Sequence, residues 1–178
     1  RSSDLAHGRE GDYSYDYLVI AAGSATNFYG NEDARRGALK LDDTGDAERL
    51  AAAADGDDFD TAIVVGGGYT GLEIATNLRR RFRLQSRRKR IAIVEISDSI
   101  LGPLPDWMKR YSRENLARLD IQVLTGTEIK EVRDRRVVFS GGKTFDSAVL
   151  IWSAGVQTPA FVRRLERDQT RQGRLQVD

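Results

Sequence analysis

The stretch TAIVVGGGYTGLEIATNLRRRFRLQSRRKRIAIVEI, residues 61–96, decides the fold. It opens with a short apolar run, residues 61–65, which leads directly into three glycines. From Tyr69 onward apolar residues recur at the spacing of a helix, and residues 90–96 form a second apolar run. A strand, a helix and a further strand in this order predict a βαβ unit whose two strands lie parallel in one sheet.

The six residues that join the first strand to the helix match the pattern GxGxxG. In this position the first glycine permits a tight turn, the second leaves space for a pyrophosphate, and the last lets the helix pack closely on the strand. The helix N-terminus adds free N–H groups and the positive end of its dipole. The pattern predicts a dinucleotide-binding loop, with a glycine-rich loop that holds no ligand as the alternative. The predicted cofactor-binding residues of this loop are Gly66, Gly67, Gly68, Tyr69, Thr70 and Gly71.

A carboxylate, Glu95, stands at the end of the second strand, 24 residues after Gly71. In this place a carboxylate hydrogen-bonds the adenosine ribose of a dinucleotide and repels a 2′-phosphate, which favours NAD(H) over NADP(H). An ordinary carboxylate at a strand end is the alternative. Arginines of the basic run at residues 79–90 could hold a 2′-phosphate. We expect this run to form a solvated helix end and loop instead.

Strands and helices alternate along the rest of the chain. Residues 15–22 are expected to form a strand buried on both faces, and residues 24–40 a loop. Thr44 is expected to cap a helix over residues 44–54, and Asp106 a second helix. The remaining strands are expected at residues 121–124, 128–132, 137–139, 143–145 and 149–153. The fold class is α/β: a Rossmann-like parallel sheet with a βαβ dinucleotide-binding unit and a three-stranded antiparallel meander insert.

Composition narrows the classes of function. The chain has 178 residues, no cysteine and one histidine, His7, so thiolate, disulfide and histidine-based chemistry are poorly supported and no metal site is expected. The formal net charge of +1 gives no reason to expect nucleic acid as a partner. No apolar run approaches the roughly 20 residues of a membrane-spanning helix. Because residue 1 is Arg and not Met, we expect a piece of a longer protein.

The segment GGGYTGLE, residues 66–73, resembles the second dinucleotide-binding domain of the pyridine nucleotide-disulfide oxidoreductase superfamily. Two flanks, YDYLVIAAGS at 15–24 and VLIWSAGV at 149–156, resemble segments that end the first part of the FAD domain and the NAD domain of that superfamily. Three stretches resemble type II NADH dehydrogenases more closely: AAGSATNFYG at 21–30, IWSAGVQTPAFVRRL at 151–165 and GRLQVD at 173–178. The resemblance implies an enzyme that passes a hydride from NADH to FAD and two electrons to a quinone.

The resemblance also implies roles for individual residues. Glu73, the one catalytic candidate, would lie near the nicotinamide, and a role in proton supply to quinone is a hypothesis. Two residues would line the nicotinamide pocket, Ala154 and Gly155. Three would face FAD in the intact protein: Ala22, Gly23 and Ser24. None of these residues makes or breaks a bond, because the hydride moves between cofactors while the protein orients them.

The resemblance implies a division of the chain into four parts. Residues 1–12 are expected to be disordered or extended, and residues 13–40 are a remnant of the FAD domain, a strand plus a loop. Residues 41–156 form the NAD(H)-binding domain, and residues 157–178 return toward the missing FAD domain. The strand at 15–22 has lost its native sheet, so it should pair with the edge of the NAD domain, with a second copy of the chain, or with nothing. Ala148 stands where the family commonly has an aspartate, and Asp146 is two residues earlier.

We therefore expect a piece that binds NADH, is inactive alone, and belongs to a protein attached peripherally to the cytoplasmic face of a membrane. A homodimer is one of its expected arrangements. The first alternative is the NAD domain of another FAD-dependent oxidoreductase, of the ferredoxin or rubredoxin reductase or sulfide:quinone oxidoreductase type. The second is a non-catalytic module that uses the basic run at 79–90 to bind nucleic acid or acidic lipid.

Overall fold

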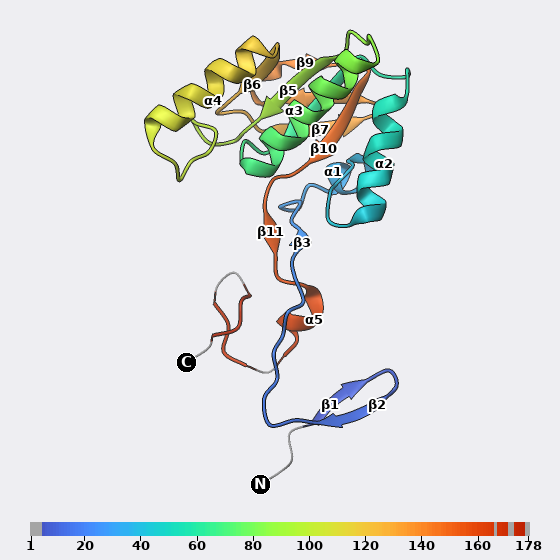
Figure 1. Ribbon diagram of the computed structural model, residues 1–178, viewed down its shortest axis with the longest axis vertical. Helices are drawn as coiled ribbons and strands as arrows, with labels where there is room; N and C mark the ends of the chain where they lie inside the picture. The colour runs from blue at the N-terminus through green and yellow to red at the C-terminus, as the bar shows by residue number, and fades with distance from the viewer. Residues whose placement is uncertain (1–4, 166, 171–172, 177–178) are drawn as a thin grey trace. The chain divides into compact units, whose positions relative to one another are not determined.

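The computed structural model describes residues 5–165, 167–170 and 173–176 of the chain (Figure 1). The chain forms two compact units: residues 25–157 make the larger one, and residues 1–24 together with 158–178 make the smaller one.

A four-stranded parallel sheet forms the centre of the larger unit, with the strand order β10-β4-β5-β6. These strands are β4 (Thr61–Val65), β5 (Arg90–Val94), β6 (Ile121–Leu124) and β10 (Ala148–Trp152). β4 and all but the first residue of β5 are buried, as expected of strands that are covered on both faces. The predicted parallel sheet and its βαβ unit are confirmed.

Three helices pack beside the sheet (Figure 1): α2 (Thr44–Asp55), α3 (Tyr69–Leu84) and α4 (Asp106–Arg118). α3 joins β4 to β5, and its buried face carries Ile74, Leu78 and Phe82. These side chains form one apolar core with alternate residues of the strands, among them Ile91 and Ile93. The period of 3.6 in the sequence of α3 therefore matches the face that it buries.

A meander and a short helix cover the opposite face. The meander consists of β7 (Ile129–Arg133), β8 (Arg136–Phe139) and β9 (Thr144–Phe145), all antiparallel, with a 3₁₀ turn, η1 (Ser140–Gly142), before β9. It confirms the predicted insert. Side chains of the meander and of the segment that contains the short helix form a second core with the other alternate residues of the sheet. This core includes Phe28, Ala34, Ile63, Val94, Ile129, Val137, Phe139 and Trp152.

The expected loop at residues 24–40 is wrong in part, because it contains the helix α1 (Glu32–Gly37). Asn31 caps it by accepting a hydrogen bond from the Ala34 N–H, 2.9 Å away. Two acidic residues follow in the first turn, and two arginines occupy the last, as the helix dipole favours. The same segment contains β3 (Ala25–Thr26), which pairs with β11 (Val156–Gln157).

Two predicted helix caps are also wrong. Asp43, not Thr44, caps α2, and its carboxylate accepts from the Asp46 N–H at 2.7 Å. Pro105 takes the cap position of α4 without a side-chain hydrogen bond, so Asp106 is the first helical residue. Each error is one residue, and in the first case several N-capping residue types stand side by side.

The smaller unit contains a hairpin of β1 (Leu5–Gly8) and β2 (Gly11–Ser14), and the helix α5 (Ala160–Arg163). The strand expected at residues 15–22 is wrong: within the described part of the chain this segment pairs with no other strand. Tyr17 is 92% exposed and Val19 85%, so the apolar run is unburied. Pairing of this segment with a second copy of the chain stays a prediction.

Candidate functional site

Three neighbouring strands of the parallel sheet end at one place, and the loops that follow them meet there. The Gly66 N–H, just after β4, donates to the Val94 carbonyl at the end of β5, at 2.8 Å. The Ser153 N–H, just after β10, donates to the Val65 carbonyl at 2.9 Å. The carboxyl edge of such a sheet is where open α/β folds bind their ligands.

Each glycine of the loop has its own geometry. Gly66 has a φ of 107°, and a Cβ on it would lie 2.9 Å from the backbone nitrogen of Ala154. A Cβ on Gly71 would lie only 1.9 Å from the Gly66 carbonyl oxygen, so α3 packs directly on the loop. A Cβ on Gly68 would meet no protein atom within 4 Å. The first and last glycines are therefore required by the protein itself, whereas the space beside Gly68 is open to a ligand.

The N-terminus of α3 is free to bind an anion. Gly68 occupies its cap position and offers no side-chain hydrogen bond. The N–H groups of Tyr69, Thr70 and Gly71 precede the first intrahelical bond, in which the Leu72 N–H donates to the Gly68 carbonyl at 3.1 Å, and among the described residues they have no acceptor. With the positive end of the helix dipole, these donors form a site suited to a phosphate or diphosphate.

Two backbone donors hold the carboxylate of Glu95 beside this loop. Its Oε2 accepts from the Gly67 N–H at 2.7 Å, and its Oε1 accepts from the Ser97 N–H at 2.8 Å. Each oxygen keeps a further lone pair for a hydroxyl donor. The carboxylate therefore has a fixed position at the end of β5 and remains able to bind a diol.

A crevice of about 150 Å³ lies at the same edge of the larger unit. It brings together three predicted site residues: Gly66, Glu95 and Ala154. Ten further residues line it that the sequence did not predict as site residues: Phe28, Tyr29, Asn31, Val65, Val94, Ile96, Thr127, Glu128, Ile129 and Trp152. They come from the ends of β4, β5 and β10, from the segment expected to be a loop, and from the meander and the residues just before it. Two adjacent aromatics inside an otherwise polar segment, Phe28 and Tyr29, were the available signal.

The other predicted site residues lie outside this crevice. Glu73 is exposed on α3 and lines a separate groove of about 450 Å³ between α2 and α3. Gly155 has a φ of 73° and lies against the ring of Tyr29. Residues 22–24, predicted to face FAD, are exposed and belong to the smaller unit.

The basic run at residues 79–90 forms the end of α3 and the loop after it, as expected, and it is largely exposed, but some of its cations are buried or bound within the protein. Arg79 is buried and donates to the Lys89 carbonyl at 3.0 Å, and burial lowers its pKa. Arg81 binds the Asp55 carboxylate with two nitrogens, at 2.8 and 2.6 Å, and together with Gln85 holds the pKa of Asp55 well below its usual range. Because α3 runs antiparallel to the strands, this run lies at their amino edge, remote from the glycine loop. Its arginines therefore cannot serve a 2′-phosphate in the crevice.

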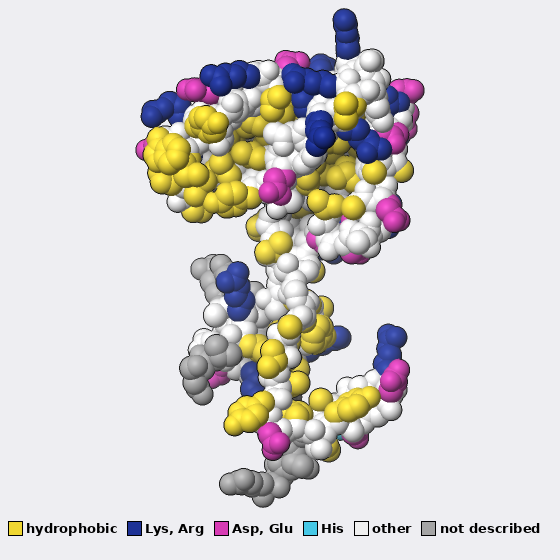
Figure 2. All heavy atoms as spheres, in the orientation of Figure 1, with side chains coloured by type: hydrophobic (Ala, Val, Ile, Leu, Met, Phe, Trp, Pro, Cys, Tyr) yellow, Lys and Arg dark blue, Asp and Glu magenta, His cyan; other side chains and the backbone are white. Residues whose placement is uncertain are grey.

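Basic side chains do gather along that amino edge. Figure 2 shows Lys and Arg side chains (dark blue) interleaved with Asp and Glu (magenta) on the larger unit. Arg87 donates to the Ala54 carbonyl at 2.8 Å and to Asp57 at 2.8 Å, and the buried Lys89 binds the Phe59 carbonyl. Contacts within the protein therefore occupy several of the basic groups that a nucleic acid or lipid would need.

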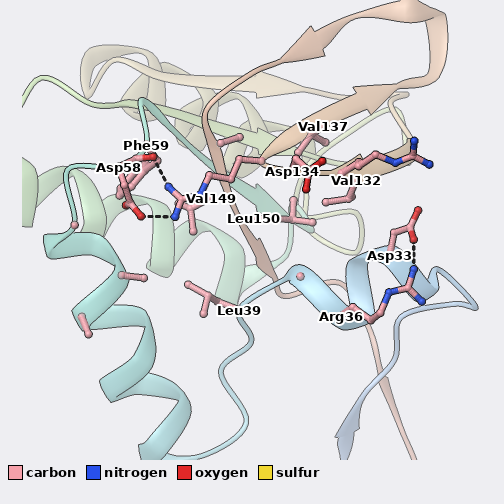
Figure 3. Close-up of a pocket in the computed structure, with 17 residues that line it drawn as sticks. Asp33, Arg36, Leu39, Asp58, Phe59, Val132, Asp134, Val137, Val149 and Leu150 are labelled. Carbon is pink, nitrogen blue, oxygen red and sulfur yellow. Dashed lines mark hydrogen bonds and ion pairs between the residues drawn. The ribbon is translucent and has the colours of Figure 1, made fainter.

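A larger cavity, about 720 Å³, lies between α1, α2, β10 and the β7–β8 turn (Figure 3). Its apolar wall includes Leu39, Val149 and Leu150. Four of its charged residues bind one another: Asp33 pairs with Arg36, and Asp58 with Arg135. Arg135 holds the pKa of Asp58 below its ordinary value. None of the predicted site residues lines this cavity, so size alone does not identify the site.

The described residues contain no group of three or more His, Cys, Asp or Glu placed to hold a metal ion. None of their helices has the length and apolar character that crossing a membrane would require.

Comparison with known proteins gives a family match over nearly the whole chain. The family model "Pyridine nucleotide-disulphide oxidoreductase" matches residues 2–178. The internal alternative NAD(P)H-ubiquinone oxidoreductase A1 of Arabidopsis thaliana is 26% identical over 93% of this chain and 36% of its own length. The type II NADH:quinone oxidoreductase Ndh of Mycobacterium tuberculosis is 28% identical over 92% of this chain and 40% of its own length. The chain thus spans about two fifths of these relatives.

Solved structures show the same fold at lower identity. Reduced Bacillus anthracis CoADR-RHD has a TM-score of 0.78 at 21% identity, with 91% of this chain and 29% of that chain covered. NDH2 from Plasmodium falciparum, solved in complex with NADH, has a TM-score of 0.75 at 21% identity, with 95% and 41% covered. A ferredoxin reductase from Rhodopseudomonas palustris has a TM-score of 0.72 at 21% identity, with 83% and 37% covered.

Proposed function

The chain belongs to the pyridine nucleotide-disulphide oxidoreductase family, and on this premise we propose that it is the NADH-binding part of a type II NADH:quinone oxidoreductase. The observation that carries the proposal is the free N-terminus of α3 beside the open face of Gly68, at the carboxyl edge of the parallel sheet. That arrangement suits the pyrophosphate of a dinucleotide. The curated relatives named above act on NADH or NAD(P)H and a quinone, by their names.

Each residue of the site has a proposed role. The N–H groups at the start of α3 bind the pyrophosphate, and Glu95 binds the ribose hydroxyls of the adenosine half. Ala154 and Gly155 line the site for the nicotinamide half of the dinucleotide. FAD, when bound in the intact protein, would supply the hydride acceptor, and residues 22–24 would face it. The chain itself orients the dinucleotide and contributes no group that takes part in the hydride transfer.

The crevice favours NADH over NADPH. Glu95 is fixed by two N–H donors, so its charge cannot swing away from a 2′-phosphate. The residues directly after it are Ile96, Ser97 and Asp98, which supply no cation to a phosphate. The basic run lies at the opposite edge of the sheet. The structure therefore supports NADH as the substrate more strongly than the sequence did.

We retain the hypothesis that Glu73 supplies a proton to the quinone. Its carboxylate lines the groove between α2 and α3 beside Thr70, at the N-terminal end of α3. Glu73→Gln in the intact protein should lower the rate of quinone reduction while the rate of flavin bleaching by NADH stays unchanged. Equal turnover of quinone by the variant and the wild type would sink the hypothesis.

The whole protein's activity requires more than this chain. Because the chain spans about two fifths of its relatives, we propose that it binds NADH but does not reduce quinone alone. We further propose that the intact protein lies peripherally on the cytoplasmic face of a membrane, with a homodimer as one arrangement.

The experiment that tests the function is steady-state oxidation of NADH and of NADPH by the intact protein with a soluble quinone. We expect preference for NADH, and a rise in KM for NADH of about tenfold or more in Glu95→Ala. Glu48→Ala, an exposed carboxylate on α2, is the matched control and should change nothing. Failure of the wild type to oxidise either coenzyme would refute the proposal.

A second candidate is a related flavoprotein reductase, favoured by the similar fold of the ferredoxin reductase. The same assay separates the two. Reduction of a ferredoxin at rates above those with quinone would replace the quinone acceptor and leave the NADH site intact.

A further inference from the structure

Tyr29 is an exposed aromatic residue at the mouth of the crevice. Its side chain is 69% exposed, yet it lines the same crevice as Gly66, Glu95 and Ala154. Its hydroxyl lies so close to Gly155 that a Cβ on that glycine would be 2.0 Å away. Among the described residues the hydroxyl has no hydrogen-bond partner. The ring therefore covers the turn after β10 without being part of the core beneath it.

The backbone of Tyr29 is held in a conformation that a non-glycine residue rarely adopts. Its φ is 50°, and the Asn27 side-chain oxygen fixes it by accepting from the Tyr29 N–H at 2.9 Å. Asn27 is itself anchored, because its N–H donates to the Gly155 carbonyl at 3.2 Å and its carbonyl accepts from the Trp152 indole at 2.9 Å. Residues kept in such strained positions cluster at sites that clamp a ligand.

The neighbouring aromatic residue, Phe28, differs from Tyr29 in that its side chain is buried and serves the packing of the core. Phe28 is 7% exposed, and its ring packs on Trp152 with centroids 5.3 Å apart. Phe28 therefore provides the packing that anchors this segment. Tyr29 adds an exposed, rigid aromatic face at the cost of backbone strain, without burying its ring in the core.

From this geometry we propose that Tyr29 is a positioning residue for the nicotinamide half of the dinucleotide. The inference rests on the proposed function, which assigns Ala154 and Gly155 to that half. The ring packs against the bound nicotinamide ring at the mouth of the crevice, next to Gly155. Flat aromatic rings stack well on one another, and a ring held by a rigid backbone loses little freedom on binding.

The test uses two ligands that share the adenosine and pyrophosphate but differ in the nicotinamide. The intact protein with oxidised flavin is titrated calorimetrically with NAD⁺ and with ADP-ribose, which lacks the nicotinamide. Tyr29→Ala and Tyr29→Gly should weaken NAD⁺ binding about five- to tenfold and leave ADP-ribose unchanged. Tyr29→Phe should retain NAD⁺ binding, because the ring carries the contact. Tyr111→Ala on α4, whose side chain is 62% exposed, is the matched control outside the crevice.

Melting temperature adds a readout that a structural role would move in the opposite direction. Tyr29→Gly should raise it or leave it unchanged, since glycine adopts a positive φ without strain. Equal weakening of both ligands, unchanged NAD⁺ binding in Tyr29→Ala, or a lower melting temperature in Tyr29→Gly would each overturn the inference. A wild type that binds neither ligand would instead refute the dinucleotide site itself.

Discussion

Two glycines of the loop, three residues apart, should respond differently to one added methyl group. Gly71→Ala places a Cβ 1.9 Å from the Gly66 carbonyl oxygen, so α3 must move off the loop. We expect a loss of about 1–3 kcal/mol in the free energy of unfolding, together with weaker NADH binding. Gly68→Ala meets no protein atom within 4 Å, so stability should be kept while NADH binding falls. Urea unfolding and NADH titration of both variants would test this, and equal stability of the two would contradict it.

The buried carboxylate of Asp46 should make stability depend on acid pH. Burial opposes its charge, but hydrogen bonds from the Asp42 N–H, Arg49 and Lys40 outweigh this and lower its pKa to about 2. Because the folded pKa lies below the ordinary 3.8, the stabilisation is complete above that value and is lost as the pH falls through about 2. Asp46→Asn should therefore be less stable than the wild type near neutral pH. The difference should shrink between about pH 4 and pH 2 in acid-dependent unfolding; a difference that is constant with pH would contradict this cause.

At the scale of elements, the sequence predicted whatever depends on local periodicity. β6 was predicted with its observed bounds, and the meander strands to within one residue at nearly every end, because two-residue alternation and turn residues are local signals. Residues 15–22 failed because an apolar run predicts burial, and burial requires a neighbouring sheet that the run itself does not specify. α1 was missed although Asn31, Glu32 and Asp33 are good start signals, since six residues are too few to show a helical period. For the candidate site, the glycine loop and Glu95 could be proposed from the sequence, whereas Tyr29 and Glu128 reach the crevice only through tertiary packing.

The corrected cap of α2 gives a prediction for that element. Asp43 accepts the Asp46 N–H at 2.7 Å, so Asp43→Ala leaves that donor unsatisfied. We expect a loss of about 1 kcal/mol in the free energy of unfolding. Thr44→Ala, one residue later, is the matched control and should cost much less, because Thr44 is the first helical residue and makes no cap bond. A larger loss for Thr44→Ala, measured by thermal or urea unfolding, would restore the cap predicted from the sequence.

At the scale of the larger unit, the two edges of the parallel sheet differ: the carboxyl edge is suited to bind a ligand, and the amino edge contributes contacts that stabilise the fold. The carboxyl edge carries unsatisfied N–H groups, glycines with open space and the strained Tyr29, all of which cost stability and suit a ligand. The amino edge carries arginines and aspartates that bind one another and the ends of helices. Many polar groups at the amino edge therefore bind within the protein, with the buried Thr61 hydroxyl and the Arg79 Nε as exceptions among the described residues, whereas the N–H donors of the glycine loop are left free. It follows that substitutions at the two edges should separate binding from stability.

Arg87 offers the sharpest test of that separation. Its guanidinium donates hydrogen bonds to the carbonyls of Ala54, Asp55 and Gly56 at the C-terminal end of α2. Arg87→Ala leaves several helix-end carbonyls without this donor and should cost about 2 kcal/mol of unfolding free energy. NADH affinity should remain that of the wild type, because Arg87 lies at the edge remote from the glycine loop. Arg88→Ala, an exposed neighbour, should change neither quantity. If Arg87→Ala weakened NADH binding while the protein stayed folded, the two edges would be coupled, and the basic run would regain a part in cofactor binding.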